Sequence, residues 1–530
     1  MLKKILTSQS RTIGSAALVV GAASLVSRLL GILRDRVLAG EFGAGVELDM
    51  YYAAFRIPDL VFNLLVLGAL SAGFIPAFTA ALKNKNAAWE LANSVLHALV
   101  LGLVLISAVL LLTAPWLVKI ITPGFTDQQL AVTTTLTRIM FLSPLLLGIS
   151  AVFGSILQSL KQFFIYSIAP IFYNAGIIIG ALYLAPAMGI IGLAWGVVVG
   201  ALLHAVIQYS AALAAGFRHQ LILDVTNKRF KTIIAMMIPR TLGLITSQVN
   251  LLIITIIGST LSVGSIAIFN FANNLQSFPL GIFGVSLAIA SFPTLAELSN
   301  HKREFIATLS ATVRQVLYLV IPSSVLLIIL RAQLVRAILG TGNFDWEDTV
   351  LTLETLSLFA FSLFAQALIV VFIRAFYALE DSRTPFAAGL VAMFANVIMA
   401  MILSEKMGVA GLALAFSMSS ILNLTILILL LHYRIGKLDG QRIIGSVAKI
   451  VVATFMLSLV AQAIKYITEP IFGTATFMGV AVQATAATFL GVTVYLLVSW
   501  LLKTEELFAI VSVFRRRSRI ASPAAEPLKE

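Results

Sequence analysis

Long apolar segments, each bounded by charged residues, Pro or Gly, follow one another along almost the whole chain. Crossing the hydrocarbon core of a bilayer as a helix takes about 20 mostly apolar residues. Segments of about that length or longer cover residues 12–36, 50–82, 91–121, 130–158, 163–185, 188–215, 231–258, 264–298, 305–339, 350–379, 384–404, 407–433, 443–466 and 474–502. This pattern predicts an all-α polytopic membrane protein with about 14 transmembrane helices.

Composition supports this fold class and removes several others. Of the 530 residues, 60% are hydrophobic and 11% charged, whereas soluble domains have about 45–50% apolar and about 25% charged residues. Soluble globular, disordered, collagen-like and disulfide-stapled classes are excluded. The chain contains no cysteine, which excludes thiolate nucleophiles, cysteine zinc sites and disulfides. The histidines are scattered without metal-ligand spacing, so neither a metal site nor a cofactor is predicted; they are His97, His204, His219, His301 and His432.

Charged residues are distributed unevenly between alternate connections. The net charge is +13. Even-numbered connections and both tails are basic, whereas the odd-numbered connections carry acidic residues such as Glu41, Asp49 and Asp345. Because basic loops stay on the cytoplasmic side of a membrane, both termini are predicted to be cytoplasmic. An even number of spans requires the same agreement. Topology and attraction to anionic membrane lipids account for the positive charge, so nucleic acid is not an expected partner.

One short motif occurs twice. Met188–Ala194 (MGIIGLA) returns 219 residues later as Met407–Ala413 (MGVAGLA), and an Asn precedes each copy within an apolar segment, Asn174 and Asn396. Such repeats are common in transporters, with the binding site between the two halves. The repeat predicts two parallel six-helix lobes around a central cavity, over residues 1–230 and 231–434, followed by a helix pair over 435–503 and a basic cytoplasmic tail over 504–530. A chance likeness of two helix starts is the alternative.

Polar side chains gather on one side of the first segment. A charged side chain at mid-bilayer costs at least about 2.5–3.5 kcal/mol, so it needs a partner or a wet cavity. At about 100° per residue, Arg28 and Asp35 fall on one stripe of the helix, with Ser27 and Arg34 on the next stripe. These four residues are therefore candidate cavity residues. For Arg34 the alternative is that its guanidinium snorkels out to the headgroups.

Three further segments contain candidate cavity residues. Arg56 lies one turn before Asp59, and the alternative is that the two neutralise each other. Arg240 follows a Pro in segment 231–258. Asn273 and Asn274 belong to an amide-rich stretch that would be costly against lipid, so they are expected to line the space between the lobes. Snorkelling at the segment ends is expected instead for Arg138, Arg314 and Arg374.

The residues alone predict a transporter of an anion or of a lipid headgroup, and no enzyme. The Gly-rich stretches lack the Lys-Ser/Thr pattern of a nucleotide-binding loop, and the short connections leave no room for a catalytic domain. Arginines offer forked, permanently charged donors to phosphate oxygens, so a cationic cavity suits an anionic cargo. An inside-negative potential would favour outward movement of such an anion by alternating access.

Several stretches resemble one transporter family. They are Ser27–Asp35, Phe42–Gly45 with Asp49, Ala54–Pro58, Gly68–Pro76, Phe278–Val285, and Arg374–Leu379 with Asp381, Arg383, Thr384 and Pro385. Together they resemble the MurJ (MviN) lipid II flippases of the MOP exporter superfamily. The resemblance implies fourteen helices and translocation of lipid II, an undecaprenyl-diphosphate-linked disaccharide-peptide, from the inner to the outer leaflet of the bacterial cytoplasmic membrane for cell-wall synthesis. Its implied partners are lipid II, membrane lipids and other cell-wall synthesis proteins.

The resemblance also implies roles for particular residues. Family positions matching Ser27, Arg28 and Arg34 are functional, as are Asp positions matching Asp35 and Asp49. The helix pair matching residues 435–503 forms a groove for the lipid tail. Well-known members carry Arg where this chain has Phe62-Asn63, and again where it has Asn273-Asn274. The cavity is therefore expected to be less cationic, with Arg56 or Arg240 compensating.

Other functions remain open at this point. An exporter of another lipid-linked oligosaccharide or a MATE-like small-molecule exporter would share the two-lobe plan, although a drug exporter would not be expected to carry the Arg28, Arg34 and Asp35 set. A membrane glycosyltransferase would need an acidic pair on a large outer loop, whereas Asp345 and Asp348 lie on a short turn. A structural scaffold would leave the polar faces within the apolar segments unexplained.

Overall fold

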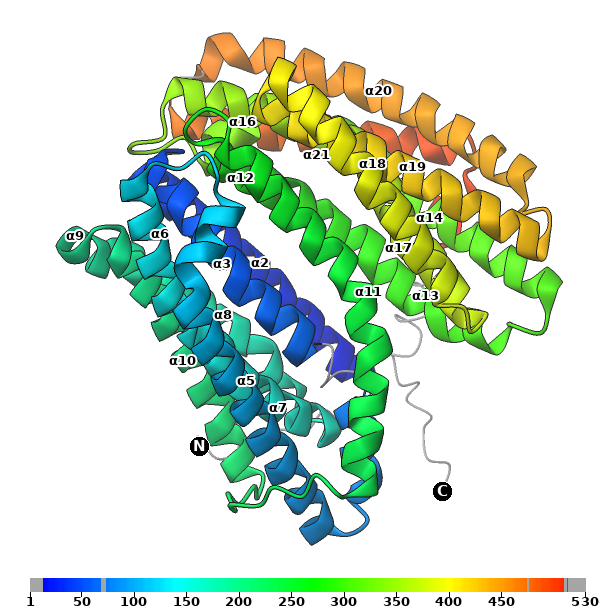
Figure 1. Ribbon diagram of the computed structural model, residues 1–530. Helices are drawn as coiled ribbons and strands as arrows, with labels where there is room; N and C mark the ends of the chain where they lie inside the picture. The colour runs from blue at the N-terminus through cyan, green and yellow to red at the C-terminus, as the bar shows by residue number, and fades with distance from the viewer. Residues whose placement is uncertain (1–12, 68–72, 474–475, 510–511, 513–530) are drawn as a thin grey trace, which may run out of the picture. The chain divides into compact units, whose positions relative to one another are not determined.

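The computed structural model describes residues 13–67, 73–473, 476–509 and 512. These residues form helices joined by short connections, and they contain no strand. The predicted all-α class is therefore confirmed, and Figure 1 traces the helices along the chain. The chain divides into two compact units that interleave along the sequence.

The first unit comprises Met1–Phe271, Ile338–Thr352 and Asn396–Leu412. Its helices are α2 (Ile13–Phe42), α3 (Val46–Val61), η1 (Phe62–Leu67), α4 (Ile75–Ala81), α5 (Lys85–Ile121), α6 (Asp127–Met140), α7 (Leu142–Ser159), α8 (Phe163–Ile179), η3 (Gly180–Leu184), α9 (Ala185–Met188), α10 (Ile190–Ala214) and α11 (Lys228–Ser259). The division falls within α12 (Ser265–Pro279), which contributes its first turns to this unit.

The second unit comprises Ala272–Ala337, Leu353–Ala395 and Ala413–Glu530. Its helices are η4 (Leu280–Val285), α13 (Ser286–Glu297), α14 (Lys302–Ile329), α15 (Arg331–Ile338), α16 (Trp346–Phe361), α17 (Leu363–Ala378), α18 (Arg383–Met407), α19 (Val409–Ile435), α20 (Gly440–Phe472) and α21 (Phe477–Leu501), of which α15, α16, α18 and α19 extend partly into the first unit. The predicted division into six-helix lobes at residue 230 stays a prediction.

Ten helices of the described chain are long and apolar enough to span a membrane, or eleven if the bent pair α16–α17 counts as one span. Each of the predicted apolar segments coincides with one or more helices, but a count of fourteen spans is not confirmed. α2 is not among these helices, and its charged residues Arg28, Arg34, Asp35 and Arg36 lie in its C-terminal half. In α11 only the part Ile245–Ser259 is a short apolar helix.

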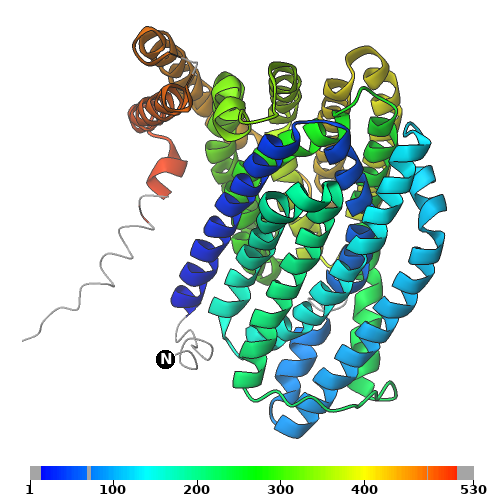
Figure 2. The same cartoon turned by 90° about the vertical axis from the view of Figure 1, so that its left-hand side faces the viewer.

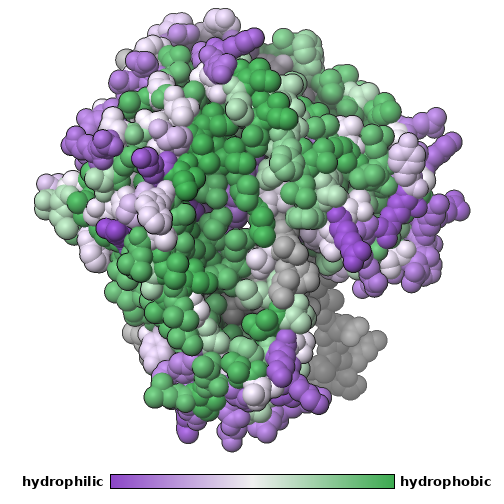
Figure 3. Space-filling view, in the orientation of Figure 1, coloured by the Kyte–Doolittle hydropathy of each residue, from purple (hydrophilic) through white to green (hydrophobic). Residues whose placement is uncertain are grey.

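Large apolar side chains cover much of the outside of the helices. On α5, Leu112 is 81% exposed and Trp116 is 75% exposed. On the face drawn in Figure 3, hydrophobic residues occupy the middle of the helices, and hydrophilic residues gather toward their ends. Contiguous exposed apolar surface is rare on soluble proteins and normal where a helix meets lipid. The chain is a multi-pass membrane protein.

Glycines bring α8 and the adjoining η3 into backbone contact with α10. A Cβ on Gly176 would lie 2.2 Å from the Cα of Gly200, and a Cβ on Gly180 would lie 2.5 Å from the Cα of Gly196. In lipid, helices associate through such close packing because apolar side chains gain nothing by leaving lipid tails. This contact fixes α8 beside α10, and Figure 2 shows the two helices side by side.

The two copies of the repeated motif adopt the same backbone. Gly189 and Gly408 have φ of 60° and 56°, in the region that favours glycine. A Cβ on Gly192 would lie 2.4 Å from Leu184 O, and one on Gly411 would lie 2.3 Å from Leu403 O. In both copies the contacted residue lies at the same distance upstream in sequence. The motif therefore marks one tight helix–helix turn made twice, and the two repeated lobes that it predicts stay a prediction.

Candidate functional site

Arg34 is held within the first unit by two partners. Its Nε and Nη2 donate to Asp35 Oδ1 at 3.0 and 2.7 Å, and its Nη1 donates to Asn174 Oδ1 on α8 at 3.1 Å. The Asn174 amide in turn donates to Pro170 O. Asp35 is 5% exposed, and a buried carboxylate requires a paired cation. Arg34 and Asp35 thus form an ion pair that faces α8 inside the helices of this unit.

Arg56, on α3, is bound by neutral oxygens. Its Nε donates to Thr255 Oγ1 on α11 at 2.9 Å, and its Nη2 donates to Asn270 Oδ1 on α12 at 2.8 Å. Thr255 is 1% exposed. A small hollow beside Arg56 is lined by Thr255, Asn270, Phe269 and Leu412. These two hydrogen-bond partners are neutral and orient the guanidinium, and the carboxylate within electrostatic range of Arg56 is Asp59, one turn further along α3.

Tyr52 lies on α3, one turn before Arg56. It is within electrostatic range of both Arg34 and Arg56, and its hydroxyl is buried without a hydrogen-bond partner. A buried hydroxyl without a partner costs free energy unless a ligand or water completes it. α3 therefore brings one unpaired donor–acceptor group close to two guanidinium groups.

Asp49 joins the start of α3 to the start of α12. Its two carboxylate oxygens accept from Gly264 N at 2.7 Å and Ala267 N at 2.9 Å, so it caps the amides of another helix. Gly264 has φ of 87°, and a Cβ there would lie 1.9 Å from Ala44 O. Asp49 precedes predicted segment 50–82, and burial raises the pKa of its carboxyl to about 7 despite these amides. A second carboxylate, Asp348, accepts from Ala44 N at 2.8 Å.

The other predicted cavity residues lie on α2, α11 and α12. Ser27 and Arg28 are half-buried on α2. Arg240 lies in α11, but its side chain is outside the described residues. Asn273 and Asn274 are half-buried on α12, in the second unit. Of the predicted residues, the structure brings Arg34 and Asp35 into direct contact and places Asp49 and Arg56 on one helix. Their role in a cavity stays a prediction.

Asn273 begins a chain of buried polar groups in the second unit. Gln276 donates to Asn273 Oδ1 at 3.1 Å, and Gln366 on α17 donates to Gln276 Oε1 at 2.9 Å. Gln366 also donates to Ser362 Oγ, which lies 2.9 Å from Ser417 Oγ on α19. Gln276 is 1% exposed and Ser362 and Ser417 are fully buried. Satisfied networks of this kind fix the relative positions of the helices that carry them.

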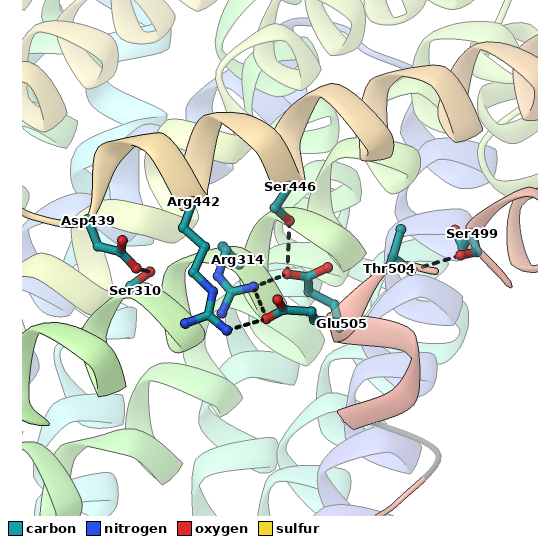
Figure 4. Close-up of polar contacts among 9 residues, drawn as sticks. Ser310, Arg314, Asp439, Arg442, Ser446, Ser499, Thr504 and Glu505 are labelled. Atoms are coloured by element: carbon teal, nitrogen blue, oxygen red, sulfur yellow. Dashed lines mark hydrogen bonds and ion pairs between the residues drawn. The ribbon is translucent and has the colours of Figure 1, made fainter. Parts of the chain in front are cut away.

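Four charged residues meet where the chain leaves α21 (Figure 4). Arg314 Nη1 donates to Glu506 Oε1 at 2.7 Å and to Glu505 Oε2 at 2.9 Å. Arg442 on α20 donates to the same Glu505 oxygen at 2.7 Å, and Ser446 Oγ donates to Glu506 Oε1. We name Arg314, Arg442, Glu505 and Glu506 the C-terminal ion cluster. The Arg314 hydrogen bond, followed by that from Arg442, holds the pKa of Glu505 below its usual range.

The expectation that Arg314 snorkels to the membrane surface is wrong. Arg314 is 6% exposed, and its guanidinium is buried against Glu506 on the segment after α21. The acidic pair Glu505-Glu506, at the start of a tail predicted to be basic, was the signal in the sequence.

Some polar residues of these sites were not predicted. Tyr52 and Thr255 look like ordinary residues of apolar helices, and only the fold places them beside arginines. Gln366 lies alone in an apolar run, and its partner Gln276 is 90 residues away. The sequence signal for this hydrogen bond was the position of Gln366 within an apolar segment, because an amide there requires a polar partner.

Comparison with known proteins places the chain in a family. The family model described as lipid II flippase MurJ matches residues 38–483. The chain is 30% identical to a probable lipid II flippase MurJ of Vibrio cholerae over 438 residues, which is 80% of this chain and 83% of the relative. It is 30% identical to a probable lipid II flippase MurJ of Rhizobium tropici over 470 residues, 86% of this chain and 88% of the relative.

Solved structures agree on the fold. A lipid II flippase MurJ in the inward closed conformation matches with a TM-score of 0.76 at 23% identity, covering 92% of this chain and 98% of that one. An inward-facing multidrug resistance MATE transporter of the MOP superfamily matches with a TM-score of 0.65 at 12% identity, covering 80% and 99%. The predicted family resemblance is confirmed, since the family model covers most of the sequence. The chain belongs to the lipid II flippase MurJ family.

Proposed function

We propose that this protein moves lipid II, the lipid-linked peptidoglycan precursor, from the inner to the outer leaflet of the cytoplasmic membrane by alternating access. The observation that carries the proposal is the match of the lipid II flippase MurJ family model to residues 38–483, which spans both compact units. Transport rather than catalysis is the proposed activity.

The charge arrangement on α2 and α3 supports an anionic cargo. Arg34 is paired with Asp35, so this pair contributes little net charge. Arg56 is oriented by Thr255 and Asn270, which are neutral, and it keeps donors for a diphosphate. Tyr52 adds a buried hydroxyl without a partner beside both arginines. In this proposal Arg56 takes over the role that an arginine at Phe62-Asn63 would have in other members.

The proposed topology follows from the charge distribution. Basic even-numbered connections and tails place both termini in the cytoplasm. The lobes are 1–230 and 231–434, and α20 and α21 within 435–503 hold the lipid tail in a groove. Apolar side chains on this helix pair are widely exposed, among them Phe455 at 60% and Phe489 at 70%, which suits contact with a polyprenyl chain. Other cell-wall synthesis proteins are proposed partners at the cytoplasmic loops.

The test is complementation of a bacterium depleted of its own lipid II flippase, together with an assay of lipid II reaching the outer leaflet. We expect growth and exposure to be restored by the native chain, and lost with Arg28→Ala, Arg34→Ala or Arg56→Met. The matched control is Arg138→Ala, because Arg138 is an exposed arginine on α6. Every variant is compared at equal amounts of inserted protein.

The outcomes separate the alternatives. Restored growth with loss in the three variants supports lipid II transport through these arginines. Full activity of all three variants would refute the assignment of these arginines to the cavity, but it would not contradict lipid II as the substrate. Failure of the native chain, although correctly inserted, would point to another lipid-linked oligosaccharide or to a MATE-like cargo, which transport assays with those substrates would identify.

A further inference from the structure

The connection between α10 and α11 is fixed against α5. In Figures 1 and 2 this connection, residues 215–227, runs past the end of α5 where that helix begins. Asn93, fully buried on α5, donates to Arg218 O at 2.9 Å and accepts from Gln220 N at 3.0 Å. Ser94 Oγ accepts from Asp224 N at 3.1 Å. The residue between the two backbone groups that Asn93 binds, His219, is therefore held in one position.

His219 meets a second histidine one turn beyond Asn93. His97 Nε2 lies 3.2 Å from His219 Nε2, and His97 Nδ1 lies 3.0 Å from Ile222 O. A carbonyl oxygen only accepts, so Nδ1 carries the proton, and the neutral imidazole has its lone pair on Nε2. That lone pair points at the other ring. His219 is solvent-exposed and His97 half-buried, so the point between them is accessible.

The spacing of the two nitrogens fits a shared metal ion. Two imidazole nitrogens bound to a tetrahedral Zn²⁺ at about 2.0–2.1 Å stand about 3.3 Å apart. The observed separation is 3.2 Å. A metal-bound histidine commonly donates its other ring N–H to a backbone carbonyl, as His97 does to Ile222, which fixes the ring and its tautomer. On binding, the metal replaces the hydrogen bond between the rings.

The location suits an aqueous ion. α5 has 37 residues, whereas about 20 cross the hydrocarbon core, so roughly 17 residues lie outside it. His97 lies toward the end of α5 that begins at Lys85, where the polar connection packs against it. No group of three or more His, Cys, Asp or Glu side chains converges in the described part of the chain. Water must therefore fill the remaining positions of any ion bound here.

We propose that His97 and His219 form a binding site for one divalent transition-metal ion of the kind that imidazole prefers, such as Zn²⁺. Imidazole pairs select Zn²⁺, Ni²⁺ or Cu²⁺ over Mg²⁺ and Ca²⁺, which prefer oxygen ligands. The ion ties the connection between α10 and α11 to α5. The site is separate from the arginines of α2 and α3 and does not depend on the proposed transport function.

The experiment is a Zn²⁺ titration of the full-length protein in detergent, purified through a tag without histidine and freed of metal with a chelator. Calorimetry is expected to give one Zn²⁺ per chain for the native protein. His97→Gln and His219→Gln are each expected to weaken binding more than tenfold. Asn93→Ala keeps both ligands but loses the backbone contacts that position His219, and we expect about 10–100-fold weaker binding, as for other groups that orient ligands.

His301→Gln is the matched control, because His301 is an exposed histidine before α14. Its binding should equal that of the native chain. Zn²⁺ should also raise the Tm of the native protein and not that of His219→Gln, a substitution at an exposed position that leaves the helix packing unchanged. Absence of stoichiometric binding by the native chain, or equal binding by His97→Gln and His219→Gln, would overturn the proposal. Neither result bears on lipid II transport, which has its own assay.

Discussion

Changing Glu506 to Gln removes one charge from the C-terminal ion cluster and almost nothing else. Glutamine has the size of glutamate and keeps an oxygen that can accept from Ser446 Oγ, which donates to Glu506 at 2.9 Å. Arg314 then keeps its charge with Glu505 as its remaining acidic partner. The substitution therefore tests how much the buried half of the cluster contributes to folding.

The burial of the two side chains sets the magnitude. The Arg314 side chain is 7% exposed and that of Glu506 is 3% exposed. Removing one partner of a buried ion pair destabilises a protein by about 3–5 kcal/mol, because the other charge is left without compensation. Glu505 still accepts from Arg314 but is 56% exposed, so the lower end of that range, about 3 kcal/mol, is expected. This corresponds to a Tm lower by about 6–12 °C for a domain of some 200 residues.

The assay is thermal unfolding in detergent, followed by tryptophan fluorescence, since Trp500 lies in the last turn of α21 next to the cluster. The matched control is Arg442→Gln, which breaks a pair whose side chains are 54% and 56% exposed. Exposed pairs contribute little to stability because water screens them, so its Tm should shift much less than that of Glu506→Gln. The double variant Arg314→Met with Glu506→Leu removes both buried charges and should recover most of the lost stability.

Two results would refute this reasoning. If Glu506→Gln shifts the Tm no more than Arg442→Gln, the pair between Arg314 and Glu506 does not hold the segment after α21 in place. If the double variant is as unstable as the single one, the loss comes from packing rather than from an uncompensated charge.

Three further predictions concern other parts of the fold. Asp49→Asn should flatten the dependence of stability on pH, because burial raises the pKa of the Asp49 carboxyl to about 7. The stabilisation that Asp49 contributes is complete below its ordinary pKa of about 3.9 and is lost as the pH rises through 7. A pH profile of Tm that is the same in the variant and the native chain would contradict this. Gly411→Ala should destabilise by at least about 1 kcal/mol, because its Cβ would lie 2.3 Å from Leu403 O, while Gly445→Ala, with nothing within 4 Å of the added Cβ, should be neutral or stabilising in the same thermal assay. Burial raises the pKa of Asp381, but the hydrogen bonds from Thr384 and the ion pair with Arg434 outweigh burial, so the pKa is lowered overall. The stabilisation from Asp381 is therefore present above the ordinary carboxyl pKa and is lost as the pH falls through the lowered pKa. Asp381→Asn should remove this loss of stability at acid pH, measured by thermal unfolding at a series of pH values.

The helices could be predicted from the sequence because lipid imposes a simple requirement on each segment. Segment 407–433 corresponds to α19 (Val409–Ile435), and segment 188–215 to α10 (Ile190–Ala214). The repeated motif was equally visible, because Gly408 needs positive φ and Gly411 leaves no room for a side chain. The break between α6 and α7, at Phe141, lies within one uninterrupted apolar segment. Pro144 in the first turn of α7 was the signal of this break, because Pro removes a helix hydrogen bond, and the prediction of segment 130–158 as one helix did not use it.

The sequence indicated that the arginines in apolar segments need hydrogen-bond partners, but it did not indicate which residues these partners are. The cost of a charge in lipid indicated that Arg34 and Arg56 require partners. Their oxygen ligands come from residues far away: Asn174 is 140 residues from Arg34, and Asn270 is 214 residues from Arg56. Such pairing depends on which helices become neighbours, and periodicity within one segment carries no information about neighbours. Asn174 was noticed for its place in the repeat, not for the guanidinium it binds.

The burial of Arg314 could have been predicted from the sequence with one additional rule. An arginine in the first turns of an apolar segment can either extend to the headgroups or find an acid on the same side of the membrane, and its own position does not distinguish the two. The second possibility requires an acid in a region where topology favours basic residues. Glu505 and Glu506 are two adjacent acids at the start of a tail that also carries the basic run Arg515, Arg516, Arg517 and Arg519. An acidic residue on the side of the membrane where basic residues are expected is therefore the first candidate partner for an arginine in a neighbouring apolar segment. The buried contact between Arg314 and Glu506 is a pair that this rule would find.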